Sequence, residues 1–329
     1  MHVQLDDQLN LEIAGYRIAL DSSGSLGNVC FVSHAHSDHM RAIRNKERRI
    51  LASKPTFALA GVDEIDAGEI ALDGVKIDML PSGHMLGARQ LRVEWDSQSF
   101  TYTGDLKLSE SLTAERAQVR ETDYLLLEGT FGNPRYKFPD RAEIYERIAS
   151  FVSKNYNDGH IVLLGGYALG KAQELIAIVN RFCGIKPIVS EKIHKACEVY
   201  SRFGVRLETA CVGSEEAEEL MRSNFVAIMP FHQVNFELAV KLSKAYRRSV
   251  YTAVATGWAL TTRFPVDEAF PLSDHADFEE LLEYVELARP KRIYCCHGNE
   301  ELLSHELSKR GYNAQPAAKS EIQLHLEVR

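Results

Sequence analysis

An α/β fold is predicted by three features of the sequence. Residues 1–139 contain short apolar runs separated by glycine, serine and asparagine, a pattern typical of strands joined by turns. From residue 140 onward the hydrophobic spacing becomes that of helices alternating with buried strands. The chain has 329 residues, of which 45% are hydrophobic and 26% charged, so it can bury a sizeable core. We expect two domains or one large α/β unit.

The predicted strands of the first third are rich in β-branched and aromatic residues and end at turn residues. They are "LEIAGYRIALDSSG" (11–24), "NVCFVSHAH" (28–36), "FALAG" (57–61), "EIALDGVKIDMLPSGH" (69–84), "QLRVEWDSQSFTYTGD" (90–105) and "DYLLLEG" (123–129). Further along, helices are expected at 141–156, 171–183 and 273–290, with buried strands at 160–166 and 291–298.

Charge and hydropathy limit the class of protein. The formal net charge is −8, so any binding of a polyanion requires a local positive site. No apolar run reaches the roughly 18 to 20 residues that a membrane span needs, and the first residues lack the pattern of a signal peptide. The six cysteines form no CxxC pair, which favours reduced thiols. We therefore expect a cytoplasmic protein without membrane contact, and no oligomeric state is predicted.

Histidine and aspartate are concentrated in "HAHSDH" (34–39), directly after the apolar strand "VCFV". At the end of a strand, His34 and His36 can face one ion while Asp38 and His39 turn toward a second. Neutral imidazole nitrogen and carboxylate oxygen are ligands that suit zinc and similar metals. The tight HxHxDH spacing favours a metal site over a surface loop with scattered histidines.

Two later residues complete this predicted site. His84 in "PSGHMLGA" and Asp105 in "YTGD" each follow an expected strand and a glycine, which lets backbone and ligand approach closely. Either residue alone is more typical of a structural turn. Together with the histidine loop they predict two ions, because the two carboxylate oxygens of Asp105 can bridge a pair and His84 can join His34 and His36.

The ordered motifs "HAHSDH", "GHMLG" and "TGD" resemble those of the metallo-β-lactamase superfamily. "LLLEGTFG" with Glu128, "LSDHAD" with His275 and "CCHGNE" with His297 are similar to three further motifs of its β-CASP nucleases. That family includes the nuclease of mRNA 3′-end processing, RNase J and the ligase-associated exonucleases. The resemblance implies an αββα sandwich formed by 1–139 and 263–329, with an inserted α/β β-CASP domain at 140–262.

The same resemblance implies a mechanism of phosphodiester hydrolysis. Two divalent ions, with zinc expected and manganese left open, would share a hydroxide that attacks the phosphorus atom. His297 would complete the second ion's ligands with Asp38, His39 and Asp105. His275 would protonate the departing sugar oxygen as general acid, and Glu128 would hold its other ring nitrogen.

The stretch "GGYALGKA" (165–172) nearly matches the phosphate-binding G-x-x-x-x-G-K-[ST] loop. Ala172 stands where the Mg²⁺-ligating hydroxyl is needed, so the pattern argues against an ATPase. A glycine-rich turn before a helix can still receive an anion, and Lys171 is therefore a candidate contact for a substrate phosphate. An ordinary lysine in a first helical turn is an equal alternative. Ser273 in "LSDHAD" is the other candidate.

Single-stranded RNA or DNA is the expected substrate. A histidine in the last motif is associated mainly with RNA-processing members of the family, so His297 favours RNA processing or degradation. The stretch "LLLEGTFGNPRYKFP" also resembles the ligase-associated exonucleases, which keeps a DNA exonuclease of DNA repair open. A small-molecule metallo-hydrolase and an inactive scaffold subunit are weaker alternatives, because the insert and every expected ligand are present.

Overall fold

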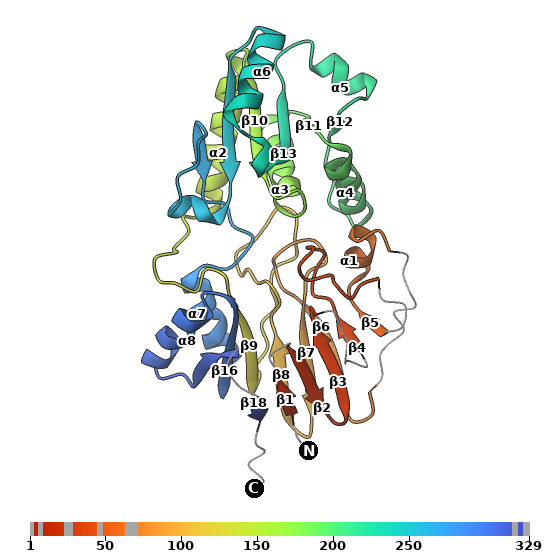
Figure 1. The fold of residues 1–329 in the computed structure, drawn as a ribbon, viewed down its shortest axis with the longest axis vertical. Coiled ribbons are helices and arrows are strands. Elements are labelled where there is room, and N and C mark those ends of the chain that lie inside the picture. The colour runs from red at the N-terminus through yellow and green to blue at the C-terminus, as the bar shows by residue number, and fades with distance from the viewer. Residues whose placement is uncertain are drawn as a thin grey trace. The chain divides into compact units, whose positions relative to one another are not determined.

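The protein divides into two compact units. The structure is a computed structural model that describes residues 3–5, 9–22, 29–44, 49–62, 72–317 and 322–324. The first unit comprises Met1–Glu110, Ala114–Lys137 and His275–Arg329, and the second comprises Ser111–Thr113 and Phe138–Asp274 (Figure 1). The sequence placed the domain junctions at 139/140 and 262/263, and that assignment stays a prediction. Among the described residues, no helix has both the length and the apolar character that crossing a membrane requires.

One six-stranded sheet of the first unit leads into the histidine loop, with strand order β18-β1-β2-β3-β4-β5. Its strands are β1 (Val3–Leu5), β2 (Asn10–Ile13), β3 (Tyr16–Leu20), β4 (Val29–Phe31), β5 (Arg49–Leu51) and β18 (Ile322–Leu324). β2 and β3 form a hairpin because Ala14 and Gly15 both adopt positive φ angles, as a two-residue type I′ turn requires. β3, β4 and β5 are parallel, so their carboxyl ends share one edge of the sheet.

The second sheet of the first unit has the order β17-β16-β9-β8-β7-β6. Its strands are β6 (Lys76–Pro81), β7 (Arg89–Trp95), β8 (Gln98–Tyr102), β9 (Tyr124–Gly129), β16 (Arg292–Gly298) and β17 (Ala314–Pro316). β8, β9 and β16 run parallel, which brings the ends of these three strands to the same edge. Residues 69–71, expected to open the strand at 69–84, lie outside the described residues.

Helices cover both outer faces of the paired sheets. An apolar cluster that includes Phe31, Val93 and Tyr102 draws its side chains from strands of both sheets. On one outer face, α7 (Phe278–Ala288) and α8 (Glu300–Lys309) pack against β9 and β16 (Figure 1). On the other, α1 (Lys54–Leu59) buries Phe57 beside Cys30 of β4. This αββα sandwich confirms the predicted fold class.

The prediction of a strand at "FALAG" (57–61) was wrong, because these residues lie in α1 and its C-terminal turn. Ser53 caps the helix by accepting a hydrogen bond from the backbone N–H of Thr56, and a proline occupies the first turn. Both are start signals of a helix. The apolar run was too short for its spacing to separate helix from strand.

The second unit is built on a six-stranded sheet in which every neighbouring pair is parallel, with order β12-β11-β13-β10-β14-β15. Its strands are β10 (Ile161–Gly166), β11 (Ile188–Val189), β12 (Ala210–Cys211), β13 (Val226–Pro230), β14 (Val250–Ala255) and β15 (Glu268–Phe270). Its helices are α2 (Arg141–Asn157), α3 (Lys171–Ile178), α4 (Glu191–Arg202), α5 (Glu215–Leu220) and α6 (Phe236–Tyr246), with short turns η1 (Val179–Cys183), η2 (Phe231–Gln233) and η3 (Gly257–Leu260). Asp140 caps α2 by accepting hydrogen bonds from the backbone N–H groups of Ala142 and Glu143, and the helix begins at residue 141 as predicted.

Candidate metal centre

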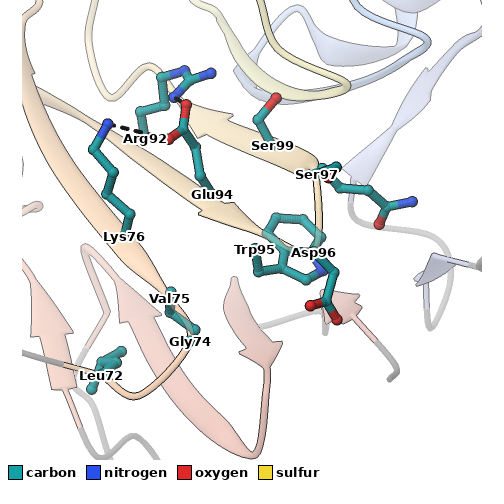
Figure 2. A pocket seen from close by; sticks show the side chains of 11 residues that line it. Leu72, Gly74, Val75, Lys76, Arg92, Glu94, Trp95, Asp96, Ser97 and Ser99 are labelled. Carbon is teal, nitrogen blue, oxygen red and sulfur yellow. Dashed lines mark hydrogen bonds and ion pairs between the residues drawn. The ribbon is translucent and has the colours of Figure 1, made fainter.

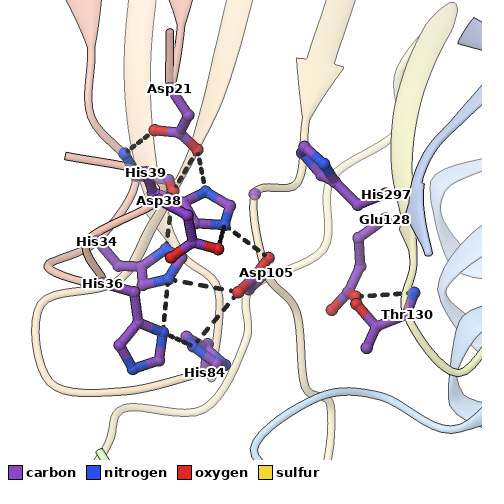
Figure 3. Close-up of polar contacts among 12 residues, drawn as sticks. Asp21, His34, His36, Asp38, His39, His84, Asp105, Glu128, Thr130 and His297 are labelled. Carbon is purple, nitrogen blue, oxygen red and sulfur yellow. Dashed lines mark hydrogen bonds and ion pairs between the residues drawn. The ribbon is translucent and has the colours of Figure 1, made fainter. Parts of the chain in front are cut away.

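Three imidazoles and one carboxylate converge in the first unit (Figure 3). The Nδ1 atom of His36 lies 3.0 Å from Nε2 of His34 and 3.2 Å from Nε2 of His84. Oδ2 of Asp105 lies 3.3 Å from the His34 nitrogen and 3.5 Å from the His84 nitrogen. All four donor atoms lie within 4.8 Å of one another. The strand ends of two sheets therefore deliver four ligand-type atoms to one point.

This donor set fits a borderline divalent metal. Bonds of about 2.0 to 2.1 Å in a tetrahedron put ligand nitrogens roughly 3.3 Å apart, close to the separations observed. His34 is fully buried, and its pKa is lowered well below its usual value by that burial and by the neighbouring histidines. A neutral imidazole is the form that binds a metal. The group His34, His36, His84 and Asp105 can thus supply three neutral nitrogens and one carboxylate oxygen to a divalent ion.

The second oxygen of Asp105 faces another pair of donors. Its Oδ1 lies 3.5 Å from Nε2 of His39, and that nitrogen lies 3.6 Å from Oδ2 of Asp38. Burial would lower the pKa of His39, but the carboxylates of Asp105, Asp21 and Asp38 outweigh it and raise that pKa to about 10. Asp105 lies between two sets of donors, and its role as a bridging ligand stays a prediction.

Asp21 is a site residue that the sequence analysis missed. Its carboxylate accepts hydrogen bonds from the backbone N–H and hydroxyl of Ser33, at 2.7 and 2.6 Å, and from the hydroxyl of Tyr102 at 2.9 Å. Its Oδ2 also lies 2.8 Å from Nδ1 of His39. Because it fixes the far ring nitrogen, Asp21 orients His39 with Nε2 toward Asp105. The sequence did contain a signal for Asp21: like the predicted ligands, it directly follows a strand, "YRIAL".

Two glycines beside the site leave no room for a side chain. A Cβ on Gly83, which precedes His84, would lie 1.9 Å from the carbonyl oxygen of Lys107. A Cβ on Gly104, which precedes Asp105, would lie 2.8 Å from the Cβ of Ser33. Both glycines also have positive φ angles, so any other residue would be strained. The close backbone approach expected at these motifs is present.

His275 also faces the carboxylate of Asp105, and Glu128 holds its imidazole in place. Its Nδ1 lies 3.1 Å from Oε1 and 3.2 Å from Oε2 of Glu128, while its Nε2 lies 3.8 Å from Oδ2 of Asp105. Glu128 is fully buried and also accepts hydrogen bonds from the backbone N–H groups of Leu106 and Thr130. Burial raises the pKa of Glu128, but His275 and these hydrogen bonds outweigh it and lower the pKa, so the group stays ionised. The carboxylate therefore holds Nδ1 and leaves Nε2 facing the site.

His297 lies at the edge of the site rather than within the converging group. Its ring centroid is 5.5 Å from that of His39, and its Nε2 lies 3.3 Å from the hydroxyl of Tyr102. The residue has a positive φ angle and interrupts the regular pairing of β16 with β9. Figure 3 shows its ring separated from the loop histidines. Its role as a ligand of the second ion stays a prediction.

Comparisons with known proteins agree with this arrangement. Residues 268–314, which contain His275 and His297, match the model of the RMMBL family, a Zn-dependent metallo-hydrolase RNA specificity domain. A protein of Opitutus terrae named probable DNA ligase is 33% identical over 315 residues, 91% of this chain and 29% of that protein. The RNase J-like protein of Methanocaldococcus jannaschii is 26% identical over 180 residues, 46% of this chain and 43% of that protein. The RMMBL match and these relatives support the resemblance of this chain to the β-CASP nucleases of the metallo-β-lactamase superfamily.

The 5′ exonuclease Apollo of Gallus gallus is 23% identical over 273 residues, 79% of this chain and 56% of that protein. The chain spans less than two thirds of the length of each of these curated relatives. A solved structure of a protein of unknown function from Enterococcus faecalis V583 matches 90% of this chain and 81% of its own, with a TM-score of 0.61 and 16% identity. That similarity shows the fold alone.

Lys171 and Ser273 lie in the second unit. The Lys171 ammonium is buried, 2.7 Å from Oδ1 of Asp274 and 3.4 Å from Oε2 of Glu174. Arg141 donates to the same Glu174 and, at 2.6 Å, to the backbone carbonyl of Ser273. This ion-pair network favours a structural role for Lys171. The predicted phosphate contacts of Lys171 and Ser273 stay predictions.

A separate pocket of about 640 Å³ opens beside the β7–β8 hairpin (Figure 2). Trp95 and Val75 form its apolar part, and the ion pairs of Glu94 with Lys76 and Arg92 form its polar part. It shares no residue with the converging imidazoles and offers no histidine. The pocket therefore does not compete with the strand edge as the place of metal chemistry.

Proposed function

We propose that this chain is a metal-dependent nuclease that hydrolyses phosphodiester bonds of single-stranded nucleic acid, with RNA favoured. One observation carries the proposal: the His275 imidazole, held by Glu128, directs Nε2 toward Asp105 beside the cluster of imidazoles. A metal site with a positioned imidazole at its edge supplies both parts of phosphodiester hydrolysis, an activated nucleophile and a proton for the leaving group.

Two divalent ions are the proposed cofactor, with zinc favoured over manganese by the imidazole-rich donors and by the description of the matching family model. His34, His36, His84 and Asp105 would hold one ion. Asp38, His39, Asp105 and His297 would hold the other. Such ions lower the pKa of bound water and polarise a phosphoryl oxygen.

The chain's own groups then perform the proton transfer. Glu128 fixes Nδ1 of His275 and stabilises the charged imidazolium form. The proton on Nε2 passes to the departing sugar oxygen as its bond to phosphorus breaks. Asp21 orients His39 in a similar way, through one hydrogen bond between its Oδ2 and Nδ1 of that histidine.

The choice between RNA and DNA rests on two opposed observations. The matching family model is described as an RNA specificity domain, and one relative is named RNase J-like. The relative that aligns over 91% of the chain is named probable DNA ligase, and another is a 5′ exonuclease, which supports a DNA exonuclease as the second candidate. Cytoplasmic location and a role in RNA processing, including mRNA 3′-end processing, stay predictions.

Digestion of one sequence made as RNA and as DNA tests the proposal. Each strand is labelled at its 5′ end and, separately, at its 3′ end, and products are followed in time with and without chelator. The proposal expects chelator-sensitive cleavage with RNA faster than DNA, and the label that shortens first gives the polarity. Faster cleavage of DNA than of RNA would favour the DNA exonuclease. No cleavage of either strand by metal-loaded protein would contradict both the RNA nuclease and the DNA exonuclease.

A further inference from the structure

Exposed aromatic side chains gather where three neighbouring strands of the second unit end. Tyr167 follows β10, Phe231 follows β13 and Trp258 lies in η3 just after β14. Their exposed fractions are 50%, 37% and 37%, and Phe236 at the start of α6 is exposed as well. Large aromatic rings are normally buried, so a group of them at one sheet edge indicates a binding surface.

The sheet register explains how these rings come together. β10 pairs with β13 up to Gly166 and Pro230, so Tyr167 and Phe231 occupy the next cross-strand position. Their ring centroids are 5.5 Å apart. β14 adjoins β10 on its other side, which places Trp258 beyond the end of the next strand.

Gly165 permits this close approach. A Cβ at this position would lie 3.0 Å from the Cα of Phe231 and 3.0 Å from a methyl carbon of Val234. The glycine-rich stretch that resembles a phosphate loop therefore has a packing reason: it lets the end of β13 lie against β10 and brings Phe231 beside Tyr167.

The strand order marks the same place as a ligand site. The chain leaves β10 toward β11 and leaves β14 toward β15, in opposite directions across the sheet. In open parallel sheets, ligands bind outside the carboxyl ends of the strands where the connections diverge in this way. The edge between β10 and β14 is such a point, and Tyr167 and Trp258 flank it.

Charge at this edge favours a polyanion. The segments that follow the three strands, 167–170, 231–236 and 256–263, contain no aspartate or glutamate, although the chain has 46 acidic residues and a net charge of −8. They do contain His232 and Arg263, both exposed. The carboxylates of Glu174 and Asp274 beside Lys171 are paired with that lysine and with Arg141, so their charge is largely neutralised. Aromatic faces at an edge without unpaired carboxylates in these three segments suit the bases of a single strand, whose phosphates an acidic edge would repel.

We infer that the strand ends carrying Tyr167, Phe231 and Trp258 form a platform on which unpaired bases of a single-stranded nucleic acid stack. Such stacking holds the strand with little dependence on sequence, because every base has an aromatic face. The choice of ligand rests on the proposed function, whereas the platform itself belongs to residues outside the metal centre.

Tryptophan fluorescence provides the test, because the chain has two tryptophans and Trp95 is 3% exposed within the core of the first unit. Metal-loaded protein is titrated with a hydrolysis-resistant phosphorothioate oligonucleotide and with an abasic strand of equal length. We expect saturable quenching by the first strand, much weaker binding of the abasic strand, and loss of the signal in Trp258→Phe. Tyr167→Ala and Phe231→Ala should each weaken binding about 5- to 150-fold, the range for removing one base stack.

Matched variants separate stacking from unfolding. Phe203→Ala removes an equally exposed ring at the end of α4 and should bind like the wild type. Tyr167→Phe keeps the aromatic face and should also bind like the wild type.

Three outcomes would contradict the inference. Wild-type affinity in Tyr167→Ala and Phe231→Ala, in protein that cleaves unmodified strands normally, would overturn the platform and leave the proposed function standing. Failure of the wild type to bind or cleave any strand would overturn both. Concentration-dependent dimerisation abolished by Tyr167→Ala, with oligonucleotide affinity unchanged, would make this edge a contact between copies and overturn the inference.

Discussion

Nδ1 of His275 lies 3.1 Å from Oε1 of Glu128, whose carboxylate is fully buried and fixed by two backbone N–H groups. This pairing sets which ring nitrogen faces Asp105. It also gives the imidazole a neighbour that favours its charged form, which a proton donor needs. The proposed function assigns this pair to proton transfer and not to metal binding, and variants can test the two roles independently.

Replacing His275 by alanine should slow cleavage by about 10² to 10⁴, the usual contribution of positioned acid catalysis. Both metals and the affinity for oligonucleotide should remain. The decisive substrate carries sulfur in place of the bridging oxygen at the scissile position, since a thiolate departs without a proton. His275→Ala should recover much of its lost rate on it, whereas His36→Ala should stay slow. Loss of metal from His275→Ala would instead make this residue a ligand.

Glu128→Gln should act as a weaker form of His275→Ala. The amide keeps the size of the side chain but removes the charge that holds the imidazole, so the ring is misoriented without being deleted. The sulfur-bridged substrate should restore most of the lost rate. A variant equally slow on both substrates would show that Glu128 acts on something other than leaving-group protonation.

Asp105→Ala should lose most of both metals, because its two oxygens face the two sets of donors. Elemental analysis should give about two metals per chain in the wild type. Asp38→Ala is the matched control: it should reduce occupancy of one ion, because its carboxylate lies 3.6 Å from Nε2 of His39, a proposed ligand of the second ion. Full metal content in Asp105→Ala would contradict the bridging position.

Lys171→Met should destabilise the protein by about 3 kcal/mol, since it removes one of the two cations, Lys171 and Arg141, that face the buried carboxylates of Asp274 and Glu174. Denaturant unfolding measures the loss. Lys186→Met is a suitable control, because its ion pair with Glu216 is exposed and contributes about 1 kcal/mol or less. If Lys171→Met unfolds at the wild-type denaturant concentration but binds oligonucleotide more weakly, Lys171 acts as a phosphate contact, as the sequence first suggested, and not as a structural residue.

The sequence predicted those parts of the site whose residues carry their own local signal. His34, His36 and His39 lie together in six residues, so their spacing alone indicated ligands. Asp21 did not stand out, because its partners Ser33 and Tyr102 reach it only through strand pairing and sheet packing. The αββα sandwich followed from the ordered motifs.

Two other features could not be predicted, for different physical reasons. Residues 57–61, which lie in α1 and its C-terminal turn, were taken for a strand because so short an apolar run fits either period. The burial of Lys171 could not be foreseen, because Asp274 lies about a hundred positions further along the chain. Contacts at such separation are decided by the folded sheet and not by local sequence.

The most direct test of the account is cleavage and metal content measured on the same samples while metal is removed and restored. One labelled RNA strand serves as substrate during a chelator titration, and zinc or manganese is then added back. The account predicts that rate and bound metal fall together, that both return on addition, and that Asp105→Ala recovers neither. Undiminished cleavage by protein stripped of metal would contradict the central claim that the converging histidines and Asp105 hold the catalytic ions.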